Sequence, residues 1–229
     1  MKSLQKKDHW MKNKASLIVV AIILGIGVGI AYSMIKDRRK LPIYAPSQIN
    51  PDLVDSSKQA VTSKHRIADF KLSNQEGEDF TSKDLDGYFY VTDFFFTTCP
   101  TICPNMSAQL QRVQEKFLQK EDFLIISHTV QPEIDSLKIL QEYANLYEAN
   151  PDKWVFLTGS KKTIYDLARK SYFAAVTEGD GGINDFIHTE NFVLVDPDKK
   201  IRGMYDGTNP DEVSELIKDI YDLKREFKF

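Results

Sequence analysis

The sequence predicts an α/β domain behind one N-terminal membrane helix, and three patterns support this fold class. Residues 15–35 form an uncharged run of 21 residues. Residues 88–130 follow the spacing of a strand, a helix and a second strand, and residues 191–223 follow that of a hairpin and an amphipathic helix. With 229 residues, 42% of them hydrophobic and 28% charged, the chain is neither wholly disordered nor fibrous.

The uncharged run is long enough to cross a bilayer. A helix rises about 1.5 Å per residue and needs roughly 20 residues to cross the hydrocarbon layer. We therefore assign residues 1–14 to a cytoplasmic tail and residues 15–35 to a retained transmembrane anchor. A cleaved signal peptide is the alternative, because basic residues precede the run and Ala31-Tyr32-Ser33 is a weak cleavage pattern. Basic residues are almost equally numerous on both sides, so charge counting does not set the orientation.

Two glycines of the run, Gly25 and Gly29, form a GxxxG pair. Small residues at this spacing let two membrane helices approach closely, which would give a homodimer through the anchors. Ordinary glycine content of a membrane helix is the other interpretation, and the spacing alone does not decide between them.

The rest of the chain is predicted to be a tether followed by an acidic domain. Residues 41–63 are rich in Pro, Ser, Asn and Gln without a clear period, which is typical of a tether, and we assign residues 36–63 to it. The folded domain is expected over residues 64–229. The first 35 residues hold five lysines and one aspartate, so the remainder carries 25 basic against 32 acidic residues, a net charge of −7. Such a domain is not expected to bind nucleic acid.

Hydrophobic spacing predicts the elements of the domain. Residues 67–72 alternate as a half-buried strand, and a turn leads to a second short strand. Residues 88–96 are mostly aromatic and β-branched and too apolar to alternate, as in a strand buried on both faces, and we place this strand at the centre of the sheet. Helical spacing at 106–117 and an apolar run at 123–130 complete a unit with parallel strands. The later elements are a helix capped by Asp135, a strand at 154–157, a helix at 164–172, a hairpin at 191–205 and a last helix with Pro210 in its first turn after a Thr208 or Asn209 cap.

The only two cysteines of the sequence, Cys99 and Cys103, directly follow the buried strand. This junction of strand and helix is the usual ligand position of open α/β sheets. Pro104 disfavours helical geometry at Cys103, so residues 99–103 are predicted to form a tight loop that brings both sulfurs to one point. The positive end of the helix favours thiolates, which bind soft metals or exchange disulfides. Inert buried thiols, or a disulfide that closes so short a loop, are less favoured interpretations.

Two thiolates suit copper better than zinc, because zinc takes four ligands whereas Cu(I) accepts two or three soft ones. A histidine would complete such a site. His188 precedes the strand at 191–195, and its position leaves open whether it is a ligand or an ordinary loop residue. His128 closes the strand beside the cysteine strand and is expected at the surface or behind the ligands. His65 is expected to be solvated, and His9 lies before the membrane run.

Several segments together resemble the Sco/SenC family, thioredoxin-like copper proteins that help to assemble cytochrome c oxidase. They are FFFTTCPTICPNM, the preceding IADFKLSNQEGEDFT, and the later WVFLTGS and DFIHTENFVLVDPDKKIRGMYDG. The resemblance implies a thioredoxin-like mixed sheet flanked by helices, with copper held by Cys99, Cys103 and His188. It also implies one anchor with the domain outside the cytoplasm. Because the N-terminal tail is rich in lysine and lacks arginine, it looks bacterial more than mitochondrial, and we expect the anchor to lie in a bacterial inner membrane.

The chain departs from the family pattern at one position. After the second strand the family usually has Ser-x-Asp-Pro-x-x-Asp-Thr, where this chain has SHTVQPEIDS over residues 127–136. Gln131 replaces the first acid, so this chain lacks a carboxylate there. Asp135 remains, as the expected helix cap.

Two functions fit these residues. The first is a metallochaperone that passes copper to the binuclear copper site of cytochrome c oxidase subunit II. The second is a thiol–disulfide oxidoreductase in which one of Cys99 and Cys103 attacks and the other resolves, and the spacing does not show which one attacks. The chaperone needs His188 and the oxidoreductase does not. The sequence leaves open whether the copper is Cu(I), Cu(II) or both.

Overall fold

The structure is a computed structural model of the chain and describes residues 17–32, 40–62, 65–175 and 185–227. The chain divides into two compact units, Met1–Lys40 and Leu41–Phe229, and each is described by itself.

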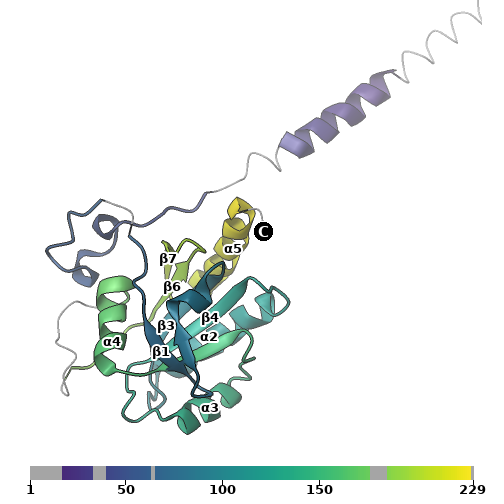
Figure 1. Cartoon of the computed structure of the whole chain (residues 1–229). Helices are drawn as coiled ribbons and strands as arrows, with labels where there is room; N and C mark the ends of the chain where they lie inside the picture. The colour runs from purple at the N-terminus through teal and green to yellow at the C-terminus, as the bar shows by residue number, and fades with distance from the viewer. Residues whose placement is uncertain (1–16, 33–39, 63–64, 176–184, 228–229) are drawn as a thin grey trace, which may run out of the picture. The chain divides into compact units, whose positions relative to one another are not determined.

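The first unit contains a helix over residues 17–32 (Figure 1). Its large apolar side chains are exposed. In the parts of the chain that are described, we find no helix whose length and apolar character would carry it across a membrane. The predicted tail at 1–14, and residues 15–16 and 33–35 at the two ends of the predicted anchor, lie outside the described residues.

The second unit is built on one mixed sheet of seven strands (Figure 1). In chain order the strands are β1 (Lys71–Asn74), β2 (Asp79–Thr81), β3 (Phe89–Phe95), β4 (Phe123–Thr129), β5 (Trp154–Thr158), β6 (Asn191–Val195) and β7 (Ile201–Asp206). Their spatial order is β2-β1-β5-β4-β3-β6-β7. The pairs β3–β4 and β4–β5 are parallel, and the other pairs are antiparallel. The middle strand is β4, so the predicted central strand, β3, lies one place to its side.

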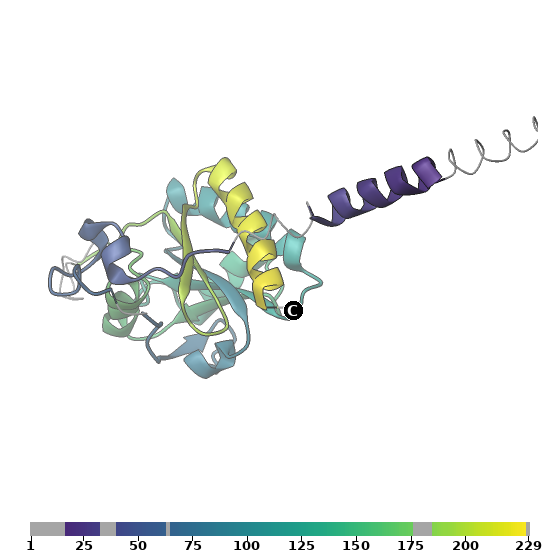
Figure 2. The ribbon, with the colours of Figure 1, turned by 90° about the horizontal axis from the view of Figure 1, so that it is seen from above.

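Helices cover both faces of this sheet. They are α2 (Ile102–Phe117), α3 (Leu137–Leu146), α4 (Lys161–Asp166) with its π-helical continuation η4 (Leu167–Ser171), and α5 (Pro210–Phe227). Phe95 of β3 packs on Tyr143 of α3, with 5.0 Å between ring centroids. The preceding Phe94 points to the opposite face and packs on Tyr172, just after η4, at 5.8 Å. Figure 2 shows α5 beside the β6–β7 hairpin. All residues of β3 and β4 are therefore buried.

Most predicted elements of the domain are confirmed. The strand–helix–strand unit is β3, α2 and β4 with parallel strands, and the hairpin is β6 and β7. The last helix begins at Pro210, where the Asn209 side chain accepts the Asp211 N–H at 3.0 Å. The first strand begins only at Lys71, because before it the Ile67 N–H bonds to Lys199 O and the Ala68 N–H bonds to the Ser171 hydroxyl.

Residues 41–62, which we predicted to belong to a tether, pack against the domain instead. They form two short 3-10 turns, η1 (Pro46–Gln48) and η2 (Pro51–Leu53). Their buried apolar residues are Leu41, Ala45, Pro46, Ile49 and Val54. Residues four apart would share one face of a helix, but the prolines at 42, 46 and 51 exclude a regular helix here, so periodicity does not find this segment. Residues 36–39 lie outside the described residues.

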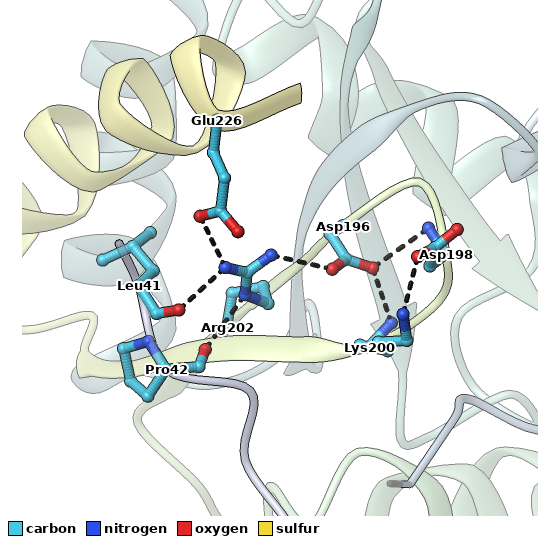
Figure 3. Close-up of polar contacts among 7 residues, drawn as sticks. All are labelled: Leu41, Pro42, Asp196, Asp198, Lys200, Arg202 and Glu226. Atoms are coloured by element: carbon cyan, nitrogen blue, oxygen red, sulfur yellow. Dashed lines mark hydrogen bonds and ion pairs between the residues drawn. The ribbon is translucent and has the colours of Figure 1, made fainter. Parts of the chain in front are cut away.

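A buried arginine holds the start of this segment (Figure 3). Arg202 of β7 donates to the carbonyls of Leu41 at 2.8 Å and Pro42 at 2.9 Å. It also pairs with Asp196 at 3.0 Å and with Glu226 of α5 at 2.7 Å. One guanidinium therefore joins the entering chain, the β6–β7 turn and the last helix.

Candidate metal centre

The structure brings the two cysteines together where β3 meets α2. Cys99 lies in the turn after β3, and its N–H bonds to Phe96 O at 3.3 Å. Cys103 lies in the first turn of α2, and its N–H donates to the Cys99 sulfur at 3.5 Å. Both thiols are free, and the two residues are only 6% and 2% exposed. The predicted meeting of the cysteines at this edge of the sheet is confirmed.

The predicted loop over residues 99–103 is wrong at its second cysteine. The helix begins at Ile102, so Cys103 and Pro104 are already helical. Proline fits there because the N–H groups of a first helical turn have no partner within the helix. Thr101 occupies the cap position without a side-chain bond, and the Cys99 sulfur accepts the Cys103 N–H in its place. The sulfur of Cys99 is thus part of the helix cap.

This placement gives the two thiols opposite pKa shifts. Burial acts to raise the pKa of the Cys99 thiol, but the N–H groups of residues 101–103 point at its sulfur and bring the pKa below its usual value. Burial raises the pKa of the Cys103 thiol to about 12, although the Phe96 backbone acts the other way. The expectation that the helix end favours a thiolate therefore holds for Cys99 and is wrong for Cys103.

His188 approaches the same edge from the segment that leads into β6. Its exposed ring lies 5.5 Å from the Phe96 ring and 4.6 Å from the Phe186 ring, measured between centroids. Phe96 is the residue whose carbonyl accepts the Cys99 N–H. Within the described residues, no three His, Cys, Asp or Glu side chains lie close enough to hold one metal ion. The glycines at 179, 181 and 182, which precede His188 in the sequence, lie outside the described residues.

Comparison with known proteins identifies the family. The SCO1/SenC family model matches residues 58–224, which is most of the chain. The chain belongs to the SCO1/SenC family. The resemblance found in the sequence is therefore confirmed, and the mixed sheet with helices on both faces is the thioredoxin-like fold of SCO1/SenC structures.

Individual members show the extent of this similarity. The SCO1 protein homolog of Bacillus subtilis (strain 168) is 36% identical over 158 residues, which are 68% of this chain and 81% of that protein. A protein of Stutzerimonas stutzeri that is named for copper binding is 28% identical over 66% of this chain and 74% of its own. The solved structure of BsSco, described as a member of the Sco family of cytochrome c oxidase assembly proteins with a disulfide switch, is 35% identical. It matches with a TM-score of 0.61 over 70% of this chain and 94% of its own.

The other two described histidines of this SCO1/SenC domain, His65 and His128, have partners of their own. His128 was expected at the surface or behind the ligands, and the surface position is wrong, because the residue is fully buried on β4 and stacks on Phe94 at 4.9 Å. Helices cover both faces of the middle strand, so a residue at its end is still inside the core. His65 was expected to be solvated, but its Nε2 lies 2.6 Å from Ser171 O. Burial lowers the His65 pKa. His9 lies outside the described residues.

Asp135 has a role that sequence reasoning missed. Ser136, not Asp135, caps α3 by accepting the Ile139 N–H at 3.4 Å. The Asp135 carboxylate is fully buried and accepts the Thr97 N–H at 3.3 Å and the hydroxyls of Thr97 and Thr129. Asp135 therefore holds the chain two residues before Cys99 against the end of β4.

Gln131, which replaces the usual acid of the SCO1/SenC pattern, supports the same turn. Its side-chain oxygen accepts the Thr98 hydroxyl at 3.1 Å, and its N–H donates to the Thr129 hydroxyl at 3.0 Å. An amide oxygen serves as well as a carboxylate for the contact with Thr98. Both residues before Cys99 are thus fixed by side chains of the loop after β4.

Proposed function

We propose that this protein is a membrane-anchored copper metallochaperone that supplies copper to subunit II of cytochrome c oxidase. The observation that carries the proposal is the pairing of Cys99 and Cys103 at the carboxyl end of β3 in a SCO1/SenC fold. Both cysteines are almost fully buried, at the edge of the sheet where His188 lies against Phe96. In the proposal, Cys99, Cys103 and His188 bind the copper.

The chemistry of these donors supports copper as the cargo. Two thiolates and one imidazole are soft or intermediate ligands, which Cu(I) and Cu(II) accept. A structural zinc site needs four protein ligands, one more than this set supplies. The Stutzerimonas stutzeri relative named for copper binding and the description of BsSco as an oxidase assembly protein support the same cargo and process. The acceptor would be the binuclear copper site of subunit II.

We also propose that residues 15–35 anchor the chain in a bacterial inner membrane, with the domain on the extracytoplasmic side. The 21 uncharged residues support an anchor. The GxxxG pair of Gly25 and Gly29 would let two anchors associate as a homodimer. The acidic domain is suited to a protein partner and not to nucleic acid.

Anaerobic copper titration of the full-length protein in detergent tests the metallochaperone. Cys99→Ser and Cys103→Ser are expected to abolish tight binding. His188→Ala is expected to weaken binding by more than the roughly 10–100-fold that loss of a group behind the ligands costs. His65→Ala is the matched control, since that ring contacts Phe173 and Ser171 instead, and it should bind like wild type. If the three site variants bind Cu(I) and Cu(II) as tightly as wild type, the proposal is wrong.

The unequal pKa values of the two thiols favour a second function, reduction of a disulfide in the partner. The Cys99 thiolate would attack one partner sulfur, and the other partner sulfur would leave and take up a proton. Cys103 would then lose its proton and attack the Cys99 sulfur, which frees the second partner thiol and leaves a Cys99–Cys103 disulfide. A dithiol reductant must reduce this disulfide before the next turnover.

Turnover without copper distinguishes the two functions. With an excess of dithiol reductant, the copper-free protein is expected to reduce an oxidised subunit II fragment repeatedly. Cys99→Ser should stop the reaction, and His188→Ala should leave its rate unchanged. A rate no higher than that of the reductant alone would exclude the oxidoreductase and leave the metallochaperone standing.

A further inference from the structure

The segment that carries His188 is fastened on both sides. Three residues before it, the Asp185 carboxylate accepts two bonds from Arg169, at 2.5 Å to Nη1 and 2.7 Å to Nη2. One residue after it, the Thr189 hydroxyl donates to Ala174 O. Consecutive Cα atoms are about 3.8 Å apart, so two fixed points this close leave the His188 backbone little freedom.

The ion pair before His188 is buried, which is unusual for such a pair. The side chains of Arg169 and Asp185 are 6% and 8% exposed. A buried pair contributes little net stability, because desolvating two charges offsets their attraction. A two-pronged guanidinium–carboxylate contact does fix the relative position and orientation of its two segments. The main contribution of this ion pair to the fold is therefore to fix the geometry of the two segments, and not to stabilise them.

The same helical segment also contacts the edge that carries the cysteines. The Tyr165 hydroxyl of α4 lies 3.0 Å from Val130 O and 3.3 Å from Asp185 O. The N–H of Val130 bonds to Phe95 O at the end of β3. The Arg169 guanidinium lies over the Tyr165 ring, 5.3 Å from its centroid. Through these contacts α4 and η4 fix the position of the His188 segment relative to the end of β3, the strand that precedes the cysteines.

We propose that Arg169 and Asp185 form a latch that positions His188 for copper. The inference rests on the proposed function, in which His188 is a copper ligand. Arg169 itself is a positioning residue, because it acts on His188 through Asp185, three residues earlier in the chain. Loosening the latch should therefore weaken the contribution of His188 and leave that of the cysteines unchanged.

A double-mutant cycle tests the latch. Arg169→Lys keeps the charge and removes the two-pronged contact. In anaerobic Cu(II) titrations of the full-length protein in detergent, Arg169→Lys is expected to raise the Kd about tenfold. In a His188→Ala background the same substitution should change the Kd less than about twofold, because it acts through His188. The electron paramagnetic resonance spectrum of bound Cu(II) should show weaker hyperfine coupling to the His188 nitrogen in Arg169→Lys. This coupling should be absent in His188→Ala.

Lys170→Met is the matched control. Lys170 is the next residue of the same turn, and its ion pair with Asp166 is largely exposed. This variant should bind copper like wild type. Equal loss from Arg169→Lys in both backgrounds would reveal a general structural effect and overturn the latch. If His188→Ala weakens copper binding and Arg169→Lys does not, the latch alone is overturned. If neither variant weakens copper binding, the assignment of His188 as a ligand, on which the latch rests, is overturned.

Discussion

Replacement of Arg202 by methionine is expected to lower the free energy of unfolding by about 3–5 kcal/mol. The Arg202 and Asp196 side chains are each 1% exposed, so the substitution leaves a buried carboxylate without its cation. Asp196 would keep the hydrogen bonds that it accepts from the N–H groups of Asp198 and Lys200, at 3.0 and 2.9 Å. The carbonyls of residues 41 and 42 would lose the bonds that Arg202 donates to them. Urea unfolding followed by the fluorescence of the buried Trp154 measures the loss.

Lys200→Met on the same hairpin is the matched control (Figure 3). Its ion pair with Asp198 spans 2.6 Å, but the Asp198 side chain is 54% exposed, so the pair should contribute at most about 1 kcal/mol. Limited proteolysis supplies a second measurement, because Arg202→Met should speed cleavage within residues 41–62 and Lys200→Met should not. Similar losses of stability from both variants would contradict the role assigned to Arg202.

The position of the cysteines could be predicted because it depends on local sequence. An apolar strand followed at once by a proline-bounded cysteine pair places Cys99 and Cys103 at a sheet edge in any parallel strand–helix unit. The packed segment at 41–62 could not be predicted in this way. Its apolar residues have no period, and its fastening to Arg202 joins positions about 160 residues apart in the sequence. Composition alone indicated a tether.

The polar residues around the site show the same limit. Asp135 precedes a helix and looks like its cap, yet its acceptor oxygens serve Thr97, 38 residues earlier in the sequence. His128 ends a strand and looks accessible, yet helices on both faces enclose it. His188 could be chosen as third ligand only through the family resemblance, since residues far apart in sequence bring it to Phe96. Contacts between distant segments decide each of these cases.

The buried His128 is expected to lower stability as the pH falls. Burial lowers the pKa of this imidazole to about 3, against 6.5 in the unfolded chain. Between these values the unfolded chain binds a proton that the folded protein does not. The contribution of His128 to the free energy of unfolding therefore rises with pH through this window and is lost as the pH falls below about 6.5. Between pH 7 and pH 4.5 the loss is about 2–3 kcal/mol.

The surroundings of the ring explain why it stays neutral. The Thr92 hydroxyl donates to Ile126 O at 2.8 Å, so it accepts a bond from Nδ1–H of His128 at 3.1 Å. Nε2 has no hydrogen-bond partner among the described residues. A second proton would therefore create a buried charge whose N–H has no acceptor, next to the Phe94 and Tyr172 rings.

Asp93, on the neighbouring strand, has the opposite effect. Burial raises the pKa of its carboxyl from 3.8 to about 7. The folded protein therefore keeps a proton that the unfolded chain releases, and this contribution to stability is lost as the pH rises toward 7. Because the two groups offset one another in the wild type, the informative quantity is the difference between each variant and the wild type.

Urea unfolding between pH 4.5 and pH 7.5 tests both groups at once. Phenylalanine at position 128 keeps a ring against Phe94 and removes the titrating nitrogens, and any repacking cost is the same at every pH. As the pH falls from 7 to 4.5, the free energy of unfolding of His128→Phe is expected to rise by about 2–3 kcal/mol relative to that of the wild type. Asp93→Asn should lose a similar amount over the same interval. If the difference in free energy of unfolding between His128→Phe and wild type does not change with pH, the histidine is not held neutral. If the difference for Asp93→Asn does not change with pH, the pKa of the Asp93 carboxyl is not raised.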